Sequence, residues 1–314
     1  MNSSGPVSLE TAGSNLAGVA WAALAVGIFA FIYLAGKLTG SSASAMQIMW
    51  LRYVGGLITV LALIIVSRTR RAELTTTQAP VHALRAAAGG FGGVAAVYAA
   101  ANMPVVSASA IGLMDGVFTV LLGVLIFRER VSGRQYAAAA LCLIGAIVVL
   151  MSKGALAGFG SSSFFPVAVG LAGAFSVAVE SVLIKTLARS EKLLSVLLYV
   201  NIFGVLIFAP LGLLNWSWVD SQQLIFFLLL GPMAIAAQSC NIKALRHSDV
   251  SVIAPVRYVW IIYGMVFGWF LFGEKVTTVG LLGAGLVLLG GLWLALTRTS
   301  EARTHLGGQS RPPA

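Results

Sequence analysis

The sequence contains very little charge for its length. Only 10% of its 314 residues are Asp, Glu, Lys or Arg, whereas 59% are hydrophobic. A soluble globular domain needs a polar surface that so few charged residues cannot supply. Apolar blocks rich in Leu, Ala, Val, Ile and Gly recur along the chain, and spans of about 20 apolar residues are typical of transmembrane helices. The shorter alternating segments of a membrane β-barrel do not occur in it. We therefore expect an all-α polytopic membrane protein.

Cysteine and histidine are also scarce. Cys142 and Cys240 lie in apolar blocks without the CxxC spacing of a metal or redox site, so we expect buried and unreactive thiols. His82, His247 and His305 lie at the ends of apolar blocks or in the C-terminal segment. The sequence therefore predicts neither a metal site nor a cofactor. It also has no phosphate-binding P-loop, which argues against direct use of ATP.

Charged or turn-rich breaks divide the hydrophobic part of the chain into ten apolar blocks. Pro104 and Pro166 lie at the starts of two of them, where a missing backbone N–H does no harm to a helix. We expect ten transmembrane helices, at approximately 17–37, 46–66, 84–102, 105–127, 134–152, 165–185, 193–214, 224–243, 250–272 and 279–297.

The basic residues predict how these helices are oriented. If both termini are cytoplasmic, fifteen of the twenty Lys and Arg residues lie in cytoplasmic segments and two, Arg52 and Arg257, lie within spans. The outside segments then hold only Lys37, Lys153 and Lys275. This asymmetry satisfies the positive-inside rule. We expect a multi-pass protein of a cell membrane, such as a bacterial inner membrane. The net charge of +10 then reflects the orientation of the helices in the lipid bilayer and does not indicate binding of nucleic acid.

A short charged turn occurs twice. The stretch LIFRERVSG at 125–133 recurs as FLFGEKVTT at 270–278, so that Glu129 corresponds to Glu274, 145 residues later. The first turn joins the fourth and fifth spans, and the second joins the ninth and tenth. Each half therefore holds five spans, and an odd number makes the second half enter the membrane from the opposite side. Inverted repeats of this kind are typical of alternating-access transporters.

The repeat divides the chain into five parts. We expect no cleaved signal peptide, because no Lys or Arg occurs in the first fourteen residues. The predicted parts are a polar N-terminal tail at 1–14, a first five-helix repeat at 15–152, a Gly/Ser-rich linker at 153–164, a second five-helix repeat at 165–297 and a disordered cytoplasmic tail at 298–314.

These features resemble those of a known family. The segments VLLGVLIFRERVSGRQYAAAALCLIGAIVVL and GMVFGWFLFGEKVTTVGLLGAGLVLLGG are similar to the two copies of the characteristic segment of the EamA-type branch of the drug/metabolite transporter superfamily. The resemblance covers roughly residues 15 to 297. It implies transport of a small molecule, and members carry amino acids, amines, nucleotide sugars, cofactors or drugs. One departure is MDGVFT, where Asp115 is followed by Gly116 at a position that is often Pro in the family.

Four ionisable residues lie inside predicted spans: Arg52, Asp115, Glu180 and Arg257. Each opposes membrane insertion by roughly 2.5–3.5 kcal/mol near the bilayer centre, so such residues usually face an internal cavity and pair. In the predicted helices, Glu180 lies about five residues and Arg257 about seven residues from the cytoplasmic end. At about 1.5 Å per residue, their depths in the membrane differ by only a few ångströms. We therefore expect these two to pair; the alternative is that the pair only fixes two helices together. Arg52 either lines the cavity or extends to the outer headgroups.

Further residues are candidates for the same site. Gln238 and Asn241 lie at the depth of the expected pair, and Tyr258 and Trp260 flank Arg257, although aromatic residues at helical spacing are as readily explained by packing. Asp115 has no evident partner. Because burial favours the neutral form of a carboxylic acid, Asp115 is the candidate for proton coupling.

The sequence thus predicts a secondary active transporter rather than an enzyme. A cavity with charges of both signs suits an amino acid or a related zwitterion or amine, with Arg257 holding the carboxylate and Glu180 or Asp115 the amine. Efflux or exchange is the favoured direction, and proton coupling and a homodimer through the glycine-rich helices are further hypotheses. The alternatives are uptake or exchange of a larger metabolite, such as S-adenosylmethionine or a nucleotide-linked compound, and a passive facilitator or channel.

Overall fold

In the computed structural model, every regular element of the described residues is a helix. The described residues are 7–40, 42–69, 74–127, 133–151, 164–187, 191–214, 216–247, 254–275, 277–290 and 292–293. The first charged turn with Glu129, the linker and the C-terminal tail lie outside them. The elements are α1 (Val7–Tyr33), α2 (Ala35–Leu38), α3 (Ala45–Val66), α4 (Ala79–Asn102), α5 (Val105–Gly112), α6 (Met114–Phe127), α7 (Gly133–Met151), α8 (Phe164–Leu187), α9 (Leu193–Leu214), α10 (Ser221–His247), the 3₁₀ helix η2 (Ala254–Val259), α12 (Trp260–Phe272) and a final helix at Thr278–Gly290.

Five of the described helices are long and apolar enough to cross a membrane. They contain the segments Ala45–Val66, Ala79–Asn102, Phe164–Ile184, Leu193–Leu214 and Ser221–Asn241. Shorter apolar helical segments occur at Ala17–Tyr33, Val105–Thr119, Tyr136–Gly145, Trp260–Phe272 and Thr278–Gly290. The prediction of an all-helical polytopic membrane protein is therefore confirmed at this level.

Local sequence features explain where the helices begin and end. Ser44 precedes α3 and its hydroxyl accepts a hydrogen bond from the Gln47 N–H at 3.2 Å, which satisfies a free donor of the first turn. Pro80 lies in the first turn of α4, and Pro104 directly precedes α5. Gly273 ends α12 with φ +60°, a left-handed conformation that a glycine adopts without strain. At the N-terminus, α1 already begins at Val7, within the segment that the sequence predicts to be a polar tail.

Two of the predicted spans are interrupted. The expected helix at 105–127 is divided at Leu113 into α5 and α6. The described part of the expected helix at 250–272 is η2 up to Val259 and α-helical from Trp260 to Phe272. A 3₁₀ segment within a membrane helix often marks a functional position. The interruptions matter here because Asp115 lies in the first turn of α6 and Arg257 lies on η2.

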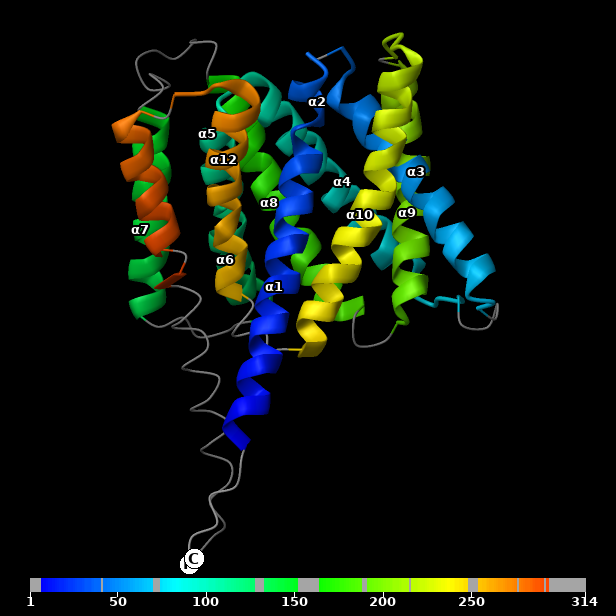
Figure 1. The fold of residues 1–314 in the computed structure, drawn as a ribbon, viewed down its shortest axis with the longest axis horizontal. Helices are drawn as coiled ribbons and strands as arrows, with labels where there is room; N and C mark the ends of the chain where they lie inside the picture. The colour runs from blue at the N-terminus through cyan, green and yellow to red at the C-terminus, as the bar shows by residue number, and fades with distance from the viewer. Residues whose placement is uncertain are drawn as a thin grey trace, which may run out of the picture.

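The helices pack side by side in one bundle, with α7 at one edge and α3 and α9 at the other (Figure 1). The most extensive contacts join α4 to α8 and α1 to α10, and α3 packs against both α9 and α10. The largest buried cluster lies among these helices and includes Met49, Phe208 and Phe227. On the other side, α5 packs against α12, and Gly145 of α7 lies against the backbone of Val287 in the final helix.

The bundle has two distinct ends. The start of α1 and the end of the final described helix lie at one end, and α2 and the segment after α12 lie at the other (Figure 1). The second end carries Lys37 and Glu274, which sequence reasoning places outside. The first carries the beginning of α1 and the end of the final described helix (Figure 1).

Candidate functional site

The first element of the site is an ion pair between helices of the two halves of the chain. The Arg257 guanidinium on η2 donates through Nη2 to Oδ2 of Asp115 on α6. Only 10% of the Asp115 side chain is exposed, whereas 50% of the Arg257 side chain is exposed. The breaks before α6 and before α12 therefore hold opposite charges against each other, one buried and one facing open space.

The second element is an ion pair between α4 and α8. Arg85 Nε lies 3.6 Å from Oε1 of Glu180, and Arg85 is only 2% exposed. Gly89 of α4 makes room for the acid, because a Cβ at this position would lie 2.6 Å from the Glu180 carboxylate. A glycine one turn after Arg85 thus allows Glu180 to reach between the two helices.

The third element is a single arginine on α3. The Arg52 guanidinium lies over the ring of Tyr53, with its Cζ 4.4 Å from the ring centroid. Its Nε is buried and has no hydrogen-bond partner in the described part of the chain. The charges of Arg85, Arg52 and Arg257 all act on Glu180. Arg52, Arg85, Asp115, Glu180 and Arg257 therefore form one group, which we call the intramembrane charge cluster.

Aromatic residues border this cluster. The rings of Tyr33 on α1 and Trp260 on α12 lie 5.5 Å apart, and the Tyr263 hydroxyl donates to the carbonyl of Ala23 at 3.1 Å. Tyr33 is also within electrostatic range of Arg52, Glu180 and Asp115. These contacts place α1 and α12 around the charge cluster and agree with a role for Trp260 at its border.

The pairing differs from the prediction in two respects. Glu180 was expected to pair with Arg257, but the structure pairs Glu180 with Arg85 and Arg257 with Asp115. The expectation that Asp115 has no partner is therefore wrong. The depth estimate assumed a regular α-helix around Arg257, whereas the structure has a 3₁₀ helix there, which rises about 2.0 Å per residue instead of about 1.5 Å.

Sequence reasoning missed Arg85 altogether, because it counted Arg85 among the cytoplasmic loop charges. Pro80 was an available signal: proline is favoured in the first turn of a helix, and a helix that begins at Ala79 holds Arg85 well inside.

The remaining candidates lie on α10 and η2. On α10, Gln238 is half-buried and Asn241 is exposed. The side chain of Tyr258 lies outside the described residues. Their participation in the site stays a prediction.

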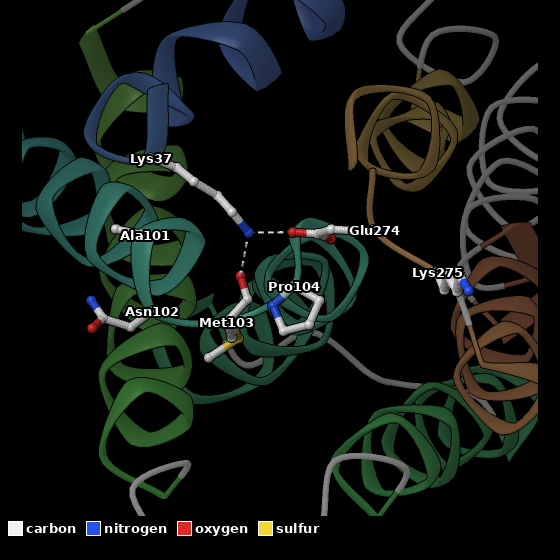
Figure 2. A pocket seen from close by; sticks show the side chains of 7 residues that line it. All are labelled: Lys37, Ala101, Asn102, Met103, Pro104, Glu274 and Lys275. Carbon is white, nitrogen blue, oxygen red and sulfur yellow. Dashed lines mark hydrogen bonds and ion pairs between the residues drawn. The ribbon is translucent and has the colours of Figure 1, made fainter. Parts of the chain in front are cut away.

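A second polar site lies at the opposite end of the bundle. A pocket of about 390 Å³ is lined by residues of α2, the end of α4 and its connection to α5, and the segment after α12: Lys37, Ala101, Asn102, Met103, Pro104, Glu274 and Lys275. Figure 2 shows Lys37 and Glu274 pointing toward each other across it, while Lys275 points away. The Lys37 ammonium forms an ion pair with Glu274 and donates to the Met103 carbonyl at 3.2 Å.

Glu274 also joins this pair to α5. Its Oε2 accepts a hydrogen bond from the Val105 N–H at 2.8 Å, at the start of α5. The side chains of Lys37 and Glu274 are only 20% and 14% exposed, so water screens their attraction less than at a free surface. The pair therefore connects the end of α1 and α2, the start of α5 and the end of α12.

The described residues hold no group of three or more His, Cys, Asp or Glu side chains that could bind a metal ion. His82 and Glu191 come close, with His82 Nε2 3.9 Å from Glu191 Oε1. Glu191 also accepts from the hydroxyls of Thr76 and Ser195 at 2.5 and 3.1 Å, and the His82 ring packs against Tyr199. This contact joins the start of α4 to the start of α9.

The division of the chain into two similar halves identifies the family. The model of the EamA-like transporter family matches residues 16–151 and again residues 164–296. The chain belongs to the EamA-like transporter family. Its members are transporters and not enzymes, and this chain is accordingly a membrane transporter, as the sequence predicts.

Relatives with assigned substrates are distant. The pseudopaline exporter CntI of Pseudomonas aeruginosa is 24% identical over 291 residues, which cover 90% of this chain and 97% of the relative. An S-adenosylmethionine uptake transporter of Rickettsia prowazekii is 23% identical over 260 residues, covering 82% and 85% of the two chains. A solved crystal structure has the same fold, with a TM-score of 0.64 at 18% identity over 93% of this chain and 99% of its own.

Proposed function

We propose that this protein is a secondary active transporter that moves a small polar metabolite by alternating access. An amino acid or a related zwitterion or amine is the favoured substrate class. The observation that carries the proposal is the intramembrane charge cluster, which holds three guanidinium groups and two carboxylates among membrane helices. Charged groups at membrane depth are costly, and they characteristically mark substrate or ion pathways.

Alternating access is supported by features that occur in both halves. In the proposed arrangement of two inverted five-helix repeats, α1 corresponds to α8, α3 to α9 and α4 to α10. Exchanging the halves turns the α4–α8 contact into the α10–α1 contact, and both are extensive. The interrupted spans, α5 with α6 and η2 with α12, correspond as well. The two matches to the family support the same division.

The two ends of the bundle support a closed side and an open side. Lys37, Glu274 and Met103 join three segments at the end that the positive-inside rule assigns to the outside. Half of the Arg257 side chain is exposed, and an arginine at this depth is tolerated when it faces a water-filled cavity. We infer a conformation open to the cytoplasm, with both termini cytoplasmic, in which the Lys37–Glu274 pair is the closed outer gate.

Counterflow in proteoliposomes tests this function. Vesicles loaded with one unlabelled compound from a panel of amino acids, amines and S-adenosylmethionine are given the same labelled compound outside. A carrier accumulates label transiently above equilibrium, whereas a passive channel does not. Arg257→Ala should lose the signal, and Arg134→Ala, which changes an exposed arginine at the start of α7, should keep it. Equal activity of the two variants would end the assignment of the charge cluster as the transport site.

A larger substrate is the second candidate. Several curated relatives from Rickettsia are described as S-adenosylmethionine uptake transporters, at 21–23% identity. Accumulation of labelled S-adenosylmethionine, but of no amino acid, would favour this candidate. Because other relatives are exporters, the direction of transport has to be measured with the protein in a known orientation. Proton coupling through Asp115 and a homodimer through glycine-rich helices stay predictions.

A further inference from the structure

We propose that Arg52 binds an anionic group of the substrate, so that the transporter selects molecules that carry a carboxylate or a phosphate over molecules whose only charge is positive. This inference rests on the proposed transport function and names the substrate chemistry of the same site. It replaces the expectation that Arg257 holds the carboxylate, because Asp115 already neutralises Arg257.

The charges of the cluster do not balance. Asp115 is bound by Arg257, and Glu180 is bound by Arg85. Arg52 has no carboxylate partner within the described ranges, and its buried Nε lacks an acceptor there. Three guanidinium groups and two carboxylates leave one positive charge over. A single anionic group on a bound molecule would restore neutrality.

Arg52 lies against a buried aromatic ring. Its guanidinium lies over the ring of Tyr53, and Tyr53 is only 3% exposed. Two further contacts hold the Tyr53 ring in place. It stacks on Phe208 with ring centroids 5.7 Å apart, and its hydroxyl donates to the Ala86 carbonyl at 3.4 Å. The Arg52 guanidinium therefore lies against a ring whose position is fixed by other contacts.

The neighbours of Arg52 suit a ligand. Its charge acts on both Tyr33 on α1 and Glu180 on α8. A guanidinium offers five N–H donors in a planar arrangement that matches the two oxygens of a carboxylate or phosphate. A molecule with an amine and no anion would meet acids that arginines already occupy. We therefore expect acidic compounds, or zwitterions whose carboxylate is free, as substrates.

The first test needs no substrate and uses the thermal unfolding of the purified full-length protein in detergent. A buried, unpaired charge is destabilising, whereas removing one partner of a buried pair leaves the other uncompensated. Arg52→Met is therefore expected to raise the unfolding temperature, and Arg85→Met is expected to lower it. A fall for Arg52→Met as large as that for Arg85→Met would show a structural partner for Arg52 and would overturn the proposal.

The second test compares ligand pairs that differ in one carboxylate. Glutamate is paired with 4-aminobutyrate, alanine with ethylamine, and lysine with cadaverine, with inorganic phosphate as a separate probe. In each pair, the compound with the additional carboxylate should stabilise the wild type more than its partner does. Arg52→Gln should weaken the binding of at least one of these carboxylates by about tenfold or more. Arg52→Lys should recover part of this loss, and Arg134→Gln should show none.

The outcomes separate two failures. If counterflow occurs but Arg52→Gln binds every panel compound as the wild type does, the anion site is wrong and the transport function stands. If the wild type shows no counterflow with any compound, the proposed function fails, and the thermal comparison of Arg52→Met with Arg85→Met still decides whether Arg52 is an unpaired charge.

Discussion

Removing the ammonium group of Lys37 is expected to open the outer end of the bundle. The Lys37→Ala substitution deletes the ion pair with Glu274 and the hydrogen bond to the Met103 carbonyl. It also removes the contact of the ammonium with the Phe272 ring, 4.8 Å from the centroid. Hydrogen bonds to charged groups contribute about 1.5–3 kcal/mol. Because the two side chains are only 20% and 14% exposed, we expect the closed outer gate to lose roughly 2–3 kcal/mol.

This loss converts into a shift between conformations. If the pair forms only in the closed conformation, about 2–3 kcal/mol lowers the ratio of closed to open molecules by roughly 30- to 150-fold. Glu274→Gln should have a smaller effect, because an amide oxygen can still accept from the Val105 N–H. Exchanging the two charges should restore only part of the closure, since a lysine at position 274 leaves that N–H without its acceptor.

The shift can be measured by labelling a cysteine at Gly112, at the end of α5 away from the Lys37–Glu274 pair. Gly112 lies three residues before Asp115, and a Cβ at this position would meet no atom within 4 Å. Gly112→Cys in a background of Cys142→Ala and Cys240→Ala gives one reporter for a membrane-impermeant thiol reagent added outside. Lys37→Ala should raise the labelling rate at least tenfold, by up to the roughly 30- to 150-fold change in the ratio of conformations. Lys275→Ala is the matched control, because Lys275 lines the same pocket but points away from Lys37 (Figure 2). Equal rates in both variants would refute this role of the pair.

Three further results are expected. Asp115→Asn and Arg257→Gln should each reduce counterflow at least tenfold, because each substitution leaves its partner uncompensated. The double variant should be no worse than the poorer single variant. Additive losses would mean that the two residues act separately. Gly89→Ala should displace the Glu180 carboxylate, 2.6 Å from the new methyl group, and reduce counterflow while the protein still folds; unchanged transport would show that this position of the acid is unimportant. Gly231→Val should force α10 away from the α3 backbone, which lies against Gly231, and lower the unfolding temperature by several degrees; an unchanged temperature would contradict the close packing.

The membrane class and the positions of most helices follow from the sequence because lipid imposes a local rule. A helix must be apolar over about 20 residues to cross the bilayer, and this requirement is visible within each block. The turn at Glu274 is also recognisable locally, because its sequence repeats that of the turn at Glu129. Its partner is not, because Lys37 lies 237 residues earlier and nothing in the local pattern specifies which residues meet at one end of a bundle.

The pairing inside the membrane was harder to predict than the presence of the charges. The sequence identifies Asp115 and Arg257 as intramembrane residues, but a contact between residues 142 apart depends on the tilt and the irregularities of two helices. The break at Leu113 and the 3₁₀ segment η2 are such irregularities. Arg85 was missed at an earlier step, because a helix that extends past its apolar part into a polar sequence cannot be recognised from hydropathy alone.

The most direct measurement of the central claim is the sidedness of the two related turns. In the proposed inverted arrangement, the halves of the chain cross the membrane in opposite senses, with the charge cluster between them. Single cysteines at Arg130 and Lys275, in the cysteine-free background, should react with an impermeant reagent from opposite faces: Lys275→Cys in intact cells and Arg130→Cys in inverted vesicles. Labelling of both positions from the same face would contradict the inverted arrangement and, with it, the assignment of Lys37 and Glu274 to an outer gate.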